Sequence, residues 1–197
     1  MTETTSRPVV TAFDWVPEFA RGLVRDLRVR WALEEIGRDY DSELLNARAP
    51  RPEGGPWIGM GTVTTRERAE EAVAAGAEFL ISPNVAPQVA SVARRAGLFL
   101  ILGALTPTEI QQADALGADV IKVYPLPPVG GPKYLDVVRQ PLGDVAPMLA
   151  GGGFGIEEIP VYKAAGASAF GLGAPLLGAT PEETRSRIAR ALELARG

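Results

Sequence analysis

The sequence predicts an α/β protein of the TIM (β/α)8 barrel type, with an atypical N-terminal unit and no helix between the second and third strands. From residue 57 onward, short apolar runs alternate with helical patterns in six successive units. Such alternation is typical of parallel strands joined by right-handed crossovers. Two earlier apolar runs raise the strand count to eight, the number that closes a TIM barrel. We therefore expect one barrel over residues 1–197, in which residues 1–56 are atypical and residues 57–197 are regular.

The first 56 residues are expected to hold two strands and one helix. Residues 8–13 are apolar and predict a short strand, and residues 40–45 predict a second one. Between them, residues 23–36 carry apolar side chains partly at helical spacing, with Gly37 as the stop. Residues 46–56 are rich in proline and glycine, which predicts a linker in place of the helix that a regular barrel has there.

The regular part begins at Trp57. Its helices are expected to end at glycines that take a left-handed conformation, as at Gly76, Gly117 and Gly166. Strands are predicted at residues 57–60, 79–81, 98–102, 120–124, 146–150 and 167–170, and helices at residues 65–75, 86–96, 107–116, 133–139, 156–165 and 181–195.

Composition excludes several classes of function. The chain has no cysteine and no histidine, so disulfides, thiol nucleophiles, the usual zinc sites and histidine-based triads are excluded. A net charge of −4 without a basic run argues against nucleic acid as a partner. No apolar run is long enough to span a membrane, and the polar start lacks the pattern of a signal peptide. A magnesium site is not excluded, but no cluster of Asp and Glu demands one. We expect a cytoplasmic protein without a membrane partner or a cofactor.

Lys122 is the first candidate for chemistry. It lies in the apolar run Val120 to Tyr124, in a chain that has only two other lysines, Lys133 and Lys163. Residues 120, 122 and 124 share one face of the predicted strand, and the run is apolar enough to predict a buried parallel strand. Burial would favour the neutral amine, which can attack a carbonyl and form a Schiff base. The alternative is a structural lysine that is paired with a carboxylate such as Asp119.

Two glycine clusters follow the last two predicted strands, and backbone N–H groups at that place in a barrel commonly bind phosphate. In addition to these two clusters, the pair Gly130 and Gly131 opens the helix after the lysine strand, where it either adds N–H donors or forms a plain turn. The two clusters are Gly151-Gly152-Gly153 and Gly171-Leu172-Gly173.

Polar groups also follow the third and fourth predicted strands. Thr62 comes at the end of the third strand, and Ser82, Pro83 and Asn84 end the fourth. A hydroxyl and an amide at this mouth of a barrel could orient a carboxylate or a carbonyl. The alternative is that the hydroxyls cap the following helices.

In these motifs the chain resembles the 2-dehydro-3-deoxy-phosphogluconate and phosphogalactonate aldolases, over about residues 57–178. Five motifs occur in the order and spacing of that family, and the Ser-Pro-Asn and Gly-Pro-x-Tyr variants are closer to the phosphogalactonate branch. They are Gly59-Met60-Gly61-Thr62-Val63, Ile81-Ser82-Pro83-Asn84, Ile121-Lys122-Val123-Tyr124-Pro125 with Gly131-Pro132-Lys133-Tyr134, Gly152-Gly153, and Gly171-Leu172-Gly173.

The resemblance implies a trimeric class I aldolase without metal, in which Lys122 forms a Schiff base with pyruvate or with the keto acid. It implies that Thr62 and Pro83 line the carboxylate pocket and that the loops with Gly152, Gly153, Gly171 and Gly173 bind the phosphate. Ala174 stands where many relatives have a serine, so a hydroxyl contact to the phosphate is lost there.

The N-terminal part departs from the family pattern. The family has an arginine at the end of its first strand, where this chain has Phe13-Asp14-Trp15, and a glutamate on its second strand that shuttles protons. Glu43 is the counterpart that the motif Ser42-Glu43-Leu44-Leu45-Asn46 suggests, while Glu34, Glu35 or no residue at all are the alternatives. Residues 13–45 also resemble the opening of a glutathione S-transferase, but residues 14–22 lack the Ser, Tyr or Cys that would activate glutathione.

The leading hypothesis is a Schiff-base aldolase that cleaves a phosphorylated 2-keto-3-deoxy sugar acid to pyruvate and glyceraldehyde 3-phosphate. A second hypothesis is a non-catalytic barrel that binds phosphate ligands but lacks the proton shuttle. A third is an isomerase or epimerase in which Lys122 is only a charge partner. Trapping of a pyruvate adduct on Lys122 discriminates the first hypothesis from the third. Release of pyruvate in a coupled lactate dehydrogenase assay discriminates it from the second.

Overall fold

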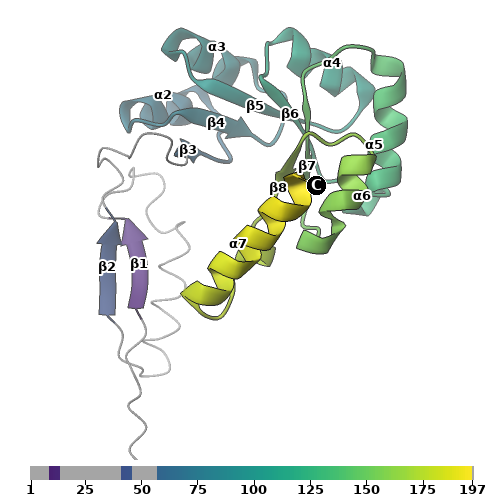
Figure 1. Cartoon of the computed structure of the whole chain (residues 1–197). Helices are drawn as coiled ribbons and strands as arrows, with labels where there is room; N and C mark the ends of the chain where they lie inside the picture. The colour runs from purple at the N-terminus through teal and green to yellow at the C-terminus, as the bar shows by residue number, and fades with distance from the viewer. Residues whose placement is uncertain (1–8, 14–40, 46–56, 197) are drawn as a thin grey trace, which may run out of the picture. The chain divides into compact units, whose positions relative to one another are not determined.

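The computed structural model of the chain describes residues 9–13, 41–45 and 57–196. Its chain folds into two compact units, which are described separately: Met1–Pro56 with Ala74–Gly76, and Trp57–Val73 with Ala77–Gly197 (Figure 1). The helix expected at residues 23–36 and the linker expected at residues 46–56 lie outside the described residues. Closure of all eight strands into one barrel therefore stays a prediction.

The N-terminal unit contains the two strands that the sequence predicts. β1 (Val9–Phe13) and β2 (Asp41–Leu45) pair in parallel, with Val9 opposite Asp41 and Phe13 opposite Leu45. Two consecutive parallel strands require a crossover connection.

The second unit is a six-stranded parallel sheet in which consecutive strands are neighbours, in the order β3 to β8 (Figure 1). Each strand is followed by a helix, so the six predicted β-α units are confirmed. The strands are β3 (Gly59–Met60), β4 (Phe79–Ser82), β5 (Phe99–Ala104), β6 (Val120–Val123), β7 (Met148–Gly151) and β8 (Ala169–Gly171). The helices are α2 (Arg66–Ala74), α3 (Pro87–Ala96), α4 (Pro107–Ala115), α5 (Pro132–Arg139), α6 (Ile159–Ala164) and α7 (Pro181–Arg196).

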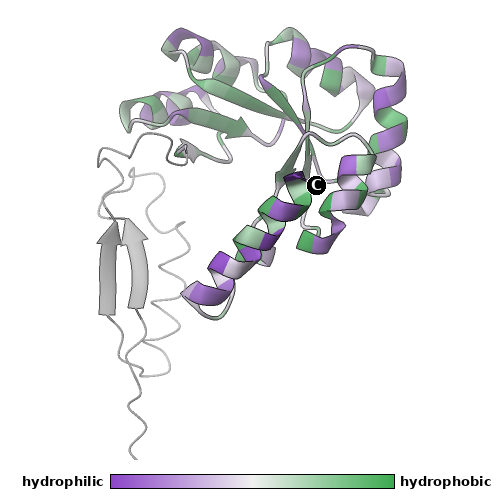
Figure 2. Ribbon diagram, viewed as in Figure 1, coloured by the Kyte–Doolittle hydropathy of each residue, from purple (hydrophilic) through white to green (hydrophobic). Residues whose placement is uncertain are grey.

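The hydrophobic core lies between the sheet and its helices. Alternate strand residues such as Leu80, Ile121 and Val123 are completely buried against helical residues such as Ile110 and Leu135. Burying one such side chain contributes roughly 1.5–3 kcal/mol. Figure 2 shows the consequence, with largely hydrophobic strands and helices that carry hydrophilic residues on their outer sides.

Several element ends differ from the predicted ones. The helix expected at residues 156–165 begins with a separate 3-10 turn, η4 (Ile156–Glu158), and the α-helix starts next to Pro160. Proline has no N–H to donate inside a helix and is tolerated only in the first turn. β3 is shorter than predicted because the N–H of Ile58 donates to the carboxylate of Glu78 instead of to a neighbouring strand, at 2.8 Å.

The predicted glycine stops are confirmed. Gly76, Gly117 and Gly166 have φ angles of +84°, +74° and +97°, the left-handed region that other residues rarely adopt. Each glycine therefore lets its helix end and the chain turn toward the next strand. Among the helices that the structure describes, none is long and apolar enough to cross a lipid bilayer.

Candidate active site

Lys122 lies near the carboxyl end of β6, between β5 and β7. Its register partners are Gly103 on β5 and Leu149 on β7. Ile121 and Val123 are fully buried, whereas Lys122 itself is only half-buried, because the helices cover one face of the strand and Lys122 points to the other. The expectation of a strand buried on both faces is therefore wrong on the lysine side, which leaves the amine accessible to a ligand.

The amine of Lys122 has no acidic partner in the parts of the chain that the structure describes. Asp119, the carboxylate considered in the structural alternative, instead accepts a hydrogen bond from the N–H of Leu100 at 2.7 Å. Partial burial lowers the pKa of the Lys122 amine below its ordinary value. A larger fraction of this amine is consequently neutral and nucleophilic at a given pH than for an exposed lysine.

Two neighbours shape the space around this side chain. The Nζ of Lys122 lies over the ring of Tyr124, 4.6 Å from the ring centroid. Gly151, at the end of β7, leaves room for the lysine stem, because an added Cβ there would lie 3.0 Å from the Cε of Lys122. Sequence reasoning placed Gly151 in a phosphate-binding cluster and assigned no role to Tyr124, although the strand alternation does place residues 122 and 124 on one face.

Thr62 follows β3 at the same edge of the sheet. Its φ angle is +59°, the only positive φ of a residue other than glycine in the described part of the chain. A β-branched residue in this region is strained by roughly 1–2 kcal/mol. Backbone strain of this kind is concentrated at functional sites, where it positions a side chain or an amide.

Pro83 and Asn84 follow β4, and their backbone lies beside Gly103, the register partner of Lys122 on β5. A Cβ at Gly103 would lie 2.1 Å from the carbonyl oxygen of Pro83, so only glycine allows this approach. The Oγ of Ser82 donates to the Oδ1 of Asn84 at 3.1 Å, and the Nδ2 of Asn84 donates to the carbonyl of Val85 at 3.2 Å. The structure thus brings Pro83 close to the lysine strand, while the amide of Asn84 is partly used within its own turn.

The two glycine clusters are neighbours at the ends of β7 and β8, where Gly151 pairs with Gly171 in the sheet. Gly152 and Gly153 have φ angles of +132° and +88°. Within the ranges described, no acceptor pairs with the N–H groups of Gly152, Gly153 or Gly173. Adjacent unpaired amides are the donors with which a main-chain anion site is built.

Comparison with models of known protein families shows to which family the chain belongs. Residues 42–190, most of the chain, match the family model for KDPG and KHG aldolase. The chain belongs to the KDPG and KHG aldolase family.

Individual relatives agree with the family. A probable 2-dehydro-3-deoxy-6-phosphogalactonate aldolase from Rhizobium meliloti (strain 1021) is 36% identical over 122 residues, which are 62% of this chain and 57% of that protein. A 2-dehydro-3-deoxy-phosphogluconate aldolase from Treponema pallidum (strain Nichols) is 36% identical over 107 residues, which are 54% of this chain and 50% of that protein. The chain thus spans about half the length of these two relatives.

A solved structure described as native KDPGal matches 99% of this chain and 97% of its own chain, with a TM-score of 0.67 and 24% sequence identity. This likeness confirms the fold class, an α/β barrel of the TIM type, and says nothing further of the chemistry. The atypical N-terminal unit, the missing helix and the resemblance of residues 13–45 to glutathione S-transferases stay predictions.

Gly131 occupies a tight turn in this aldolase family member. Its N–H donates to the carbonyl of Leu126 at 2.9 Å, and the N–H of Gly130 donates to that of Pro127 at 3.3 Å. Both amides are therefore already paired, which favours the turn over a role as phosphate donors. The hydroxyl of Tyr134, in the same motif, donates to the carbonyl of Leu105 at 2.8 Å and ties α5 to the loop after β5.

Glu43, the proposed proton shuttle, lies on β2 opposite Thr11. The structure describes the backbone of this strand but not its side chains, and Glu34 and Glu35 lie outside the described residues. The role of Glu43 stays a prediction.

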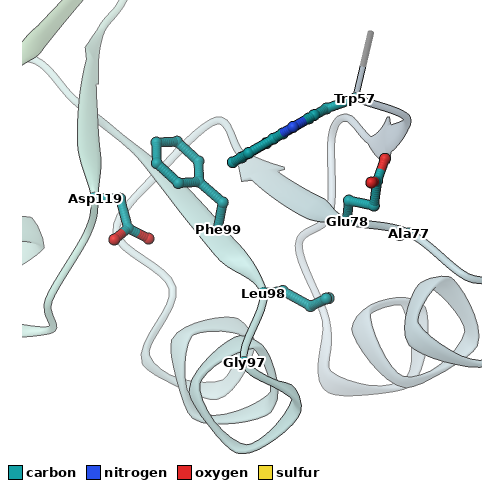
Figure 3. Close-up of a pocket in the computed structure, with 7 residues that line it drawn as sticks. All are labelled: Trp57, Ala77, Glu78, Gly97, Leu98, Phe99 and Asp119. Carbon is teal, nitrogen blue, oxygen red and sulfur yellow. The ribbon is translucent and has the colours of Figure 1, made fainter. Parts of the chain in front are cut away.

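A pocket of about 490 Å³ lies at the opposite edge of the sheet and does not belong to the aldolase site (Figure 3). It is found where β4, β5 and β6 begin, and the rings of Trp57 and Phe99 meet there edge to face at 5.4 Å. The carboxylates of Glu78 and Asp119 accept hydrogen bonds from the backbone N–H groups of Ile58 and Leu100. Both have structural roles. In the part of the chain described, no group of three or more acidic residues is arranged to hold a metal ion.

Proposed function

We propose that the protein is a class I aldolase that cleaves a phosphorylated 2-keto-3-deoxy sugar acid to pyruvate and glyceraldehyde 3-phosphate. The observation that carries the proposal is the position of Lys122. A half-buried amine without an acidic partner among the described residues lies at the same edge of the sheet as the unpaired amides of Gly152, Gly153 and Gly173. Family membership is consistent with this chemistry.

The reaction begins with attack of the neutral Lys122 amine on the C2 carbonyl of the keto acid. Loss of water from the resulting carbinolamine gives an iminium, which withdraws electrons from the neighbouring carbon. A base removes the proton of the C4 hydroxyl, the C3–C4 bond breaks, and its electron pair moves into the iminium to give an enamine. The C4 carbon leaves as the aldehyde. Protonation of the enamine at C3 and hydrolysis release pyruvate and restore the lysine.

We propose Glu43 as the base and proton shuttle, with Glu34 and Glu35 as alternatives. Thr62 and Pro83 are proposed to line the pocket for the substrate carboxylate. The amides of Gly152, Gly153, Gly171 and Gly173 are proposed to bind the phosphate, whose charge suits a cluster of N–H donors. Asn84 and Gly131 are weaker candidates, because Asn84 bonds within its own turn and the Gly131 amide is paired.

Further proposals follow from family membership and composition. The protein is proposed to act as a homotrimer, in the cytoplasm, on small phosphorylated keto acids and pyruvate. It is proposed to need neither metal nor cofactor and to bind neither nucleic acid nor membrane. Size-exclusion chromatography with light scattering would test the trimer, and activity in the presence of a chelator would test the independence from metal.

The decisive experiment is reduction of the protein by borohydride in the presence of pyruvate. We expect a mass increase for one 1-carboxyethyl group, the product of reducing the pyruvate iminium, that maps to Lys122, and loss of this adduct in Lys122→Met. Lys133→Met is the matched control, because Lys133 is exposed on α5 and should leave the adduct unchanged. A coupled lactate dehydrogenase assay with the phosphogluconate and phosphogalactonate substrates then measures turnover.

Two results would overturn the proposal. An adduct on another residue, or no adduct, would remove the Schiff base. Stabilisation by sugar phosphates without any release of pyruvate would instead favour the non-catalytic binding barrel.

A further inference from the structure

Tyr124 is the closest aromatic neighbour of the reactive amine in the described structure. Its ring lies beneath the Nζ of Lys122, 4.6 Å from the centroid, which is within the range of a cation–π contact. Tyr124 is 42% exposed, so this residue is accessible to solvent. The backbone N–H of Tyr124 donates to the carbonyl of Ala104 at 3.1 Å, which holds the residue at the end of the sheet.

The two side chains lie together over one glycine. A Cβ built at Gly151 would lie 3.0 Å from the Cε of Lys122 and 3.7 Å from the Cδ2 of Tyr124. The lysine stem and the ring of Tyr124 therefore both lie beside the backbone of β7 at Gly151. This arrangement restricts the directions in which the amine can point.

The nitrogen of Lys122 is neutral when it attacks the keto acid and becomes positively charged in the iminium of the Schiff base. The face of an aromatic ring is electron-rich and attracts a cation. A carboxylate would attract the same charge more strongly, but none pairs with Lys122 in the residues described. The ring can thus stabilise the iminium without acting as a base.

We propose that Tyr124 is a positioning residue, whose ring holds the Lys122 nitrogen and stabilises the positive charge of the iminium that Lys122 forms with the keto acid. The inference rests on the proposed Schiff-base function and adds an electrostatic partner for its intermediate. The ring, not the hydroxyl, is the group that acts, because the amine lies over the ring face.

The experiment measures the pyruvate concentration at which borohydride trapping of Lys122 is half-maximal, at one fixed pH. We expect Tyr124→Leu to raise this concentration about 2- to 30-fold, the range of an exposed to a partly desolvated cation–π contact. Tyr124→Phe keeps the ring and should stay within about 2-fold of the original protein. Trp57→Leu removes an aromatic ring at the opposite edge of the sheet and should change nothing in this assay.

A second series keeps the shape of the side chain constant. Phenylalanine and its mono-, di- and trifluorinated analogues at position 124 differ mainly in the negative charge of the ring face. We expect the half-maximal concentration to rise steadily with each added fluorine, and this series remains informative if Tyr124→Leu does not fold.

The inference is overturned if the fluorinated series is flat, if Tyr124→Leu traps pyruvate like the original protein, or if Tyr124→Phe is as impaired as Tyr124→Leu. Failure of the underlying function gives a different result, namely no adduct on Lys122 in the unsubstituted protein.

Discussion

Single residues around Lys122 determine whether the amine can react. The lysine stem passes Gly151 on β7, and its register partner on β5 is Gly103, where the loop after β4 packs against the backbone. Neither glycine needs its flexibility here, since neither has a positive φ. Both are required because a Cβ would occupy space that the lysine or the Pro83 backbone already uses.

Gly151→Ala tests this packing. The new Cβ would lie 3.0 Å from the Cε of Lys122, so the flexible lysine must swing away from its position over Tyr124. We expect the rate of borohydride trapping with pyruvate to fall about 10- to 100-fold, because a displacement of about 1 Å has effects of this size. Gly155→Ala is the control, since its Cβ would make an ordinary 3.4 Å contact with Glu158. A normal trapping rate in folded Gly151→Ala would contradict the packing argument.

The pH dependence of trapping tests the electrostatics of the same amine. Burial lowers the pKa of Lys122, and the described parts of β5, β6 and β7 bring no charged group into an ion pair with it. The neutral amine should therefore persist to lower pH, and the midpoint of the pH–rate curve for adduct formation should lie below that of N-acetyl-lysine measured in parallel. Coinciding midpoints would show that burial does not activate Lys122.

At the scale of elements, the loops after the strands carry the site, and helix caps hold these loops in place. α4 begins with a capping box in which the backbone N–H of Glu109 donates to the Oγ1 of Thr106 at 3.4 Å, and the Oε2 of Glu109 accepts from the N–H of Thr106 at 2.8 Å. Glu109 also accepts from the N–H of Leu105 at 2.9 Å, so the box fixes the end of the loop that follows β5.

Thr106→Ala removes one half of this box. We expect a loss of about 1 kcal/mol in the free energy of unfolding, measured with urea, because the orphan N–H groups at the helix start lose a partner. Thr108→Ala, an exposed threonine in the first turn of α4, should cost far less. Equal losses in the two variants would contradict the assignment.

Glu109 makes this contribution dependent on pH. The backbone N–H groups of Thr106 and Leu105 hold the pKa of Glu109 below its ordinary value. Because the pKa of Glu109 is lower in the folded than in the unfolded protein, the ionised carboxylate stabilises the fold at pH values above the unfolded-state pKa. This stabilisation disappears as the pH falls through the folded-state pKa. The stability difference between the protein and Glu109→Gln should therefore be present at neutral pH and shrink below about pH 4. A difference that does not change with pH would exclude the charged cap.

At the scale of the whole molecule, the proposed reactive amine and the proposed proton shuttle belong to different units. The six-stranded unit contains Lys122 and the glycine turns, whereas Glu43 lies on the separate pair of strands β1 and β2. An aldolase needs the amine and the proton shuttle for turnover, but only the amine to capture pyruvate. The two functions can therefore be separated by substitution.

Glu43→Gln should leave trapping of pyruvate on Lys122 intact and slow the release of pyruvate from the sugar acid about 10²- to 10⁴-fold, the usual contribution of a general acid–base group. Glu34→Gln and Glu35→Gln test the two alternatives in the same assays. Full turnover in Glu43→Gln with a loss in one of the other two would move the shuttle to that residue.

The order of elements could be predicted from local sequence because each signal is local. Period-2 and helical patterns, together with glycine at the helix ends, gave every strand and helix from residue 57 onward, and β1 and β2 as well. The errors are at element ends. Pro160 has no N–H to donate inside a helix, and the N–H of Ile58 donates to the side chain of Glu78 instead of to a neighbouring strand.

The sequence by itself determined the succession of β-α units, the family and the choice of Lys122 as the candidate for a reactive residue, since these depend on residue types at fixed spacing. Only the tertiary structure decided that Gly103 and Gly151 flank the lysine and that the ring of Tyr124 lies under its amine. It also showed that the Gly131 amide is already paired, while those of Gly152 and Gly153 have no partner among the described residues. Strand register and long-range hydrogen bonds set these contacts, and they join residues that are far apart in the chain and carry no local signal.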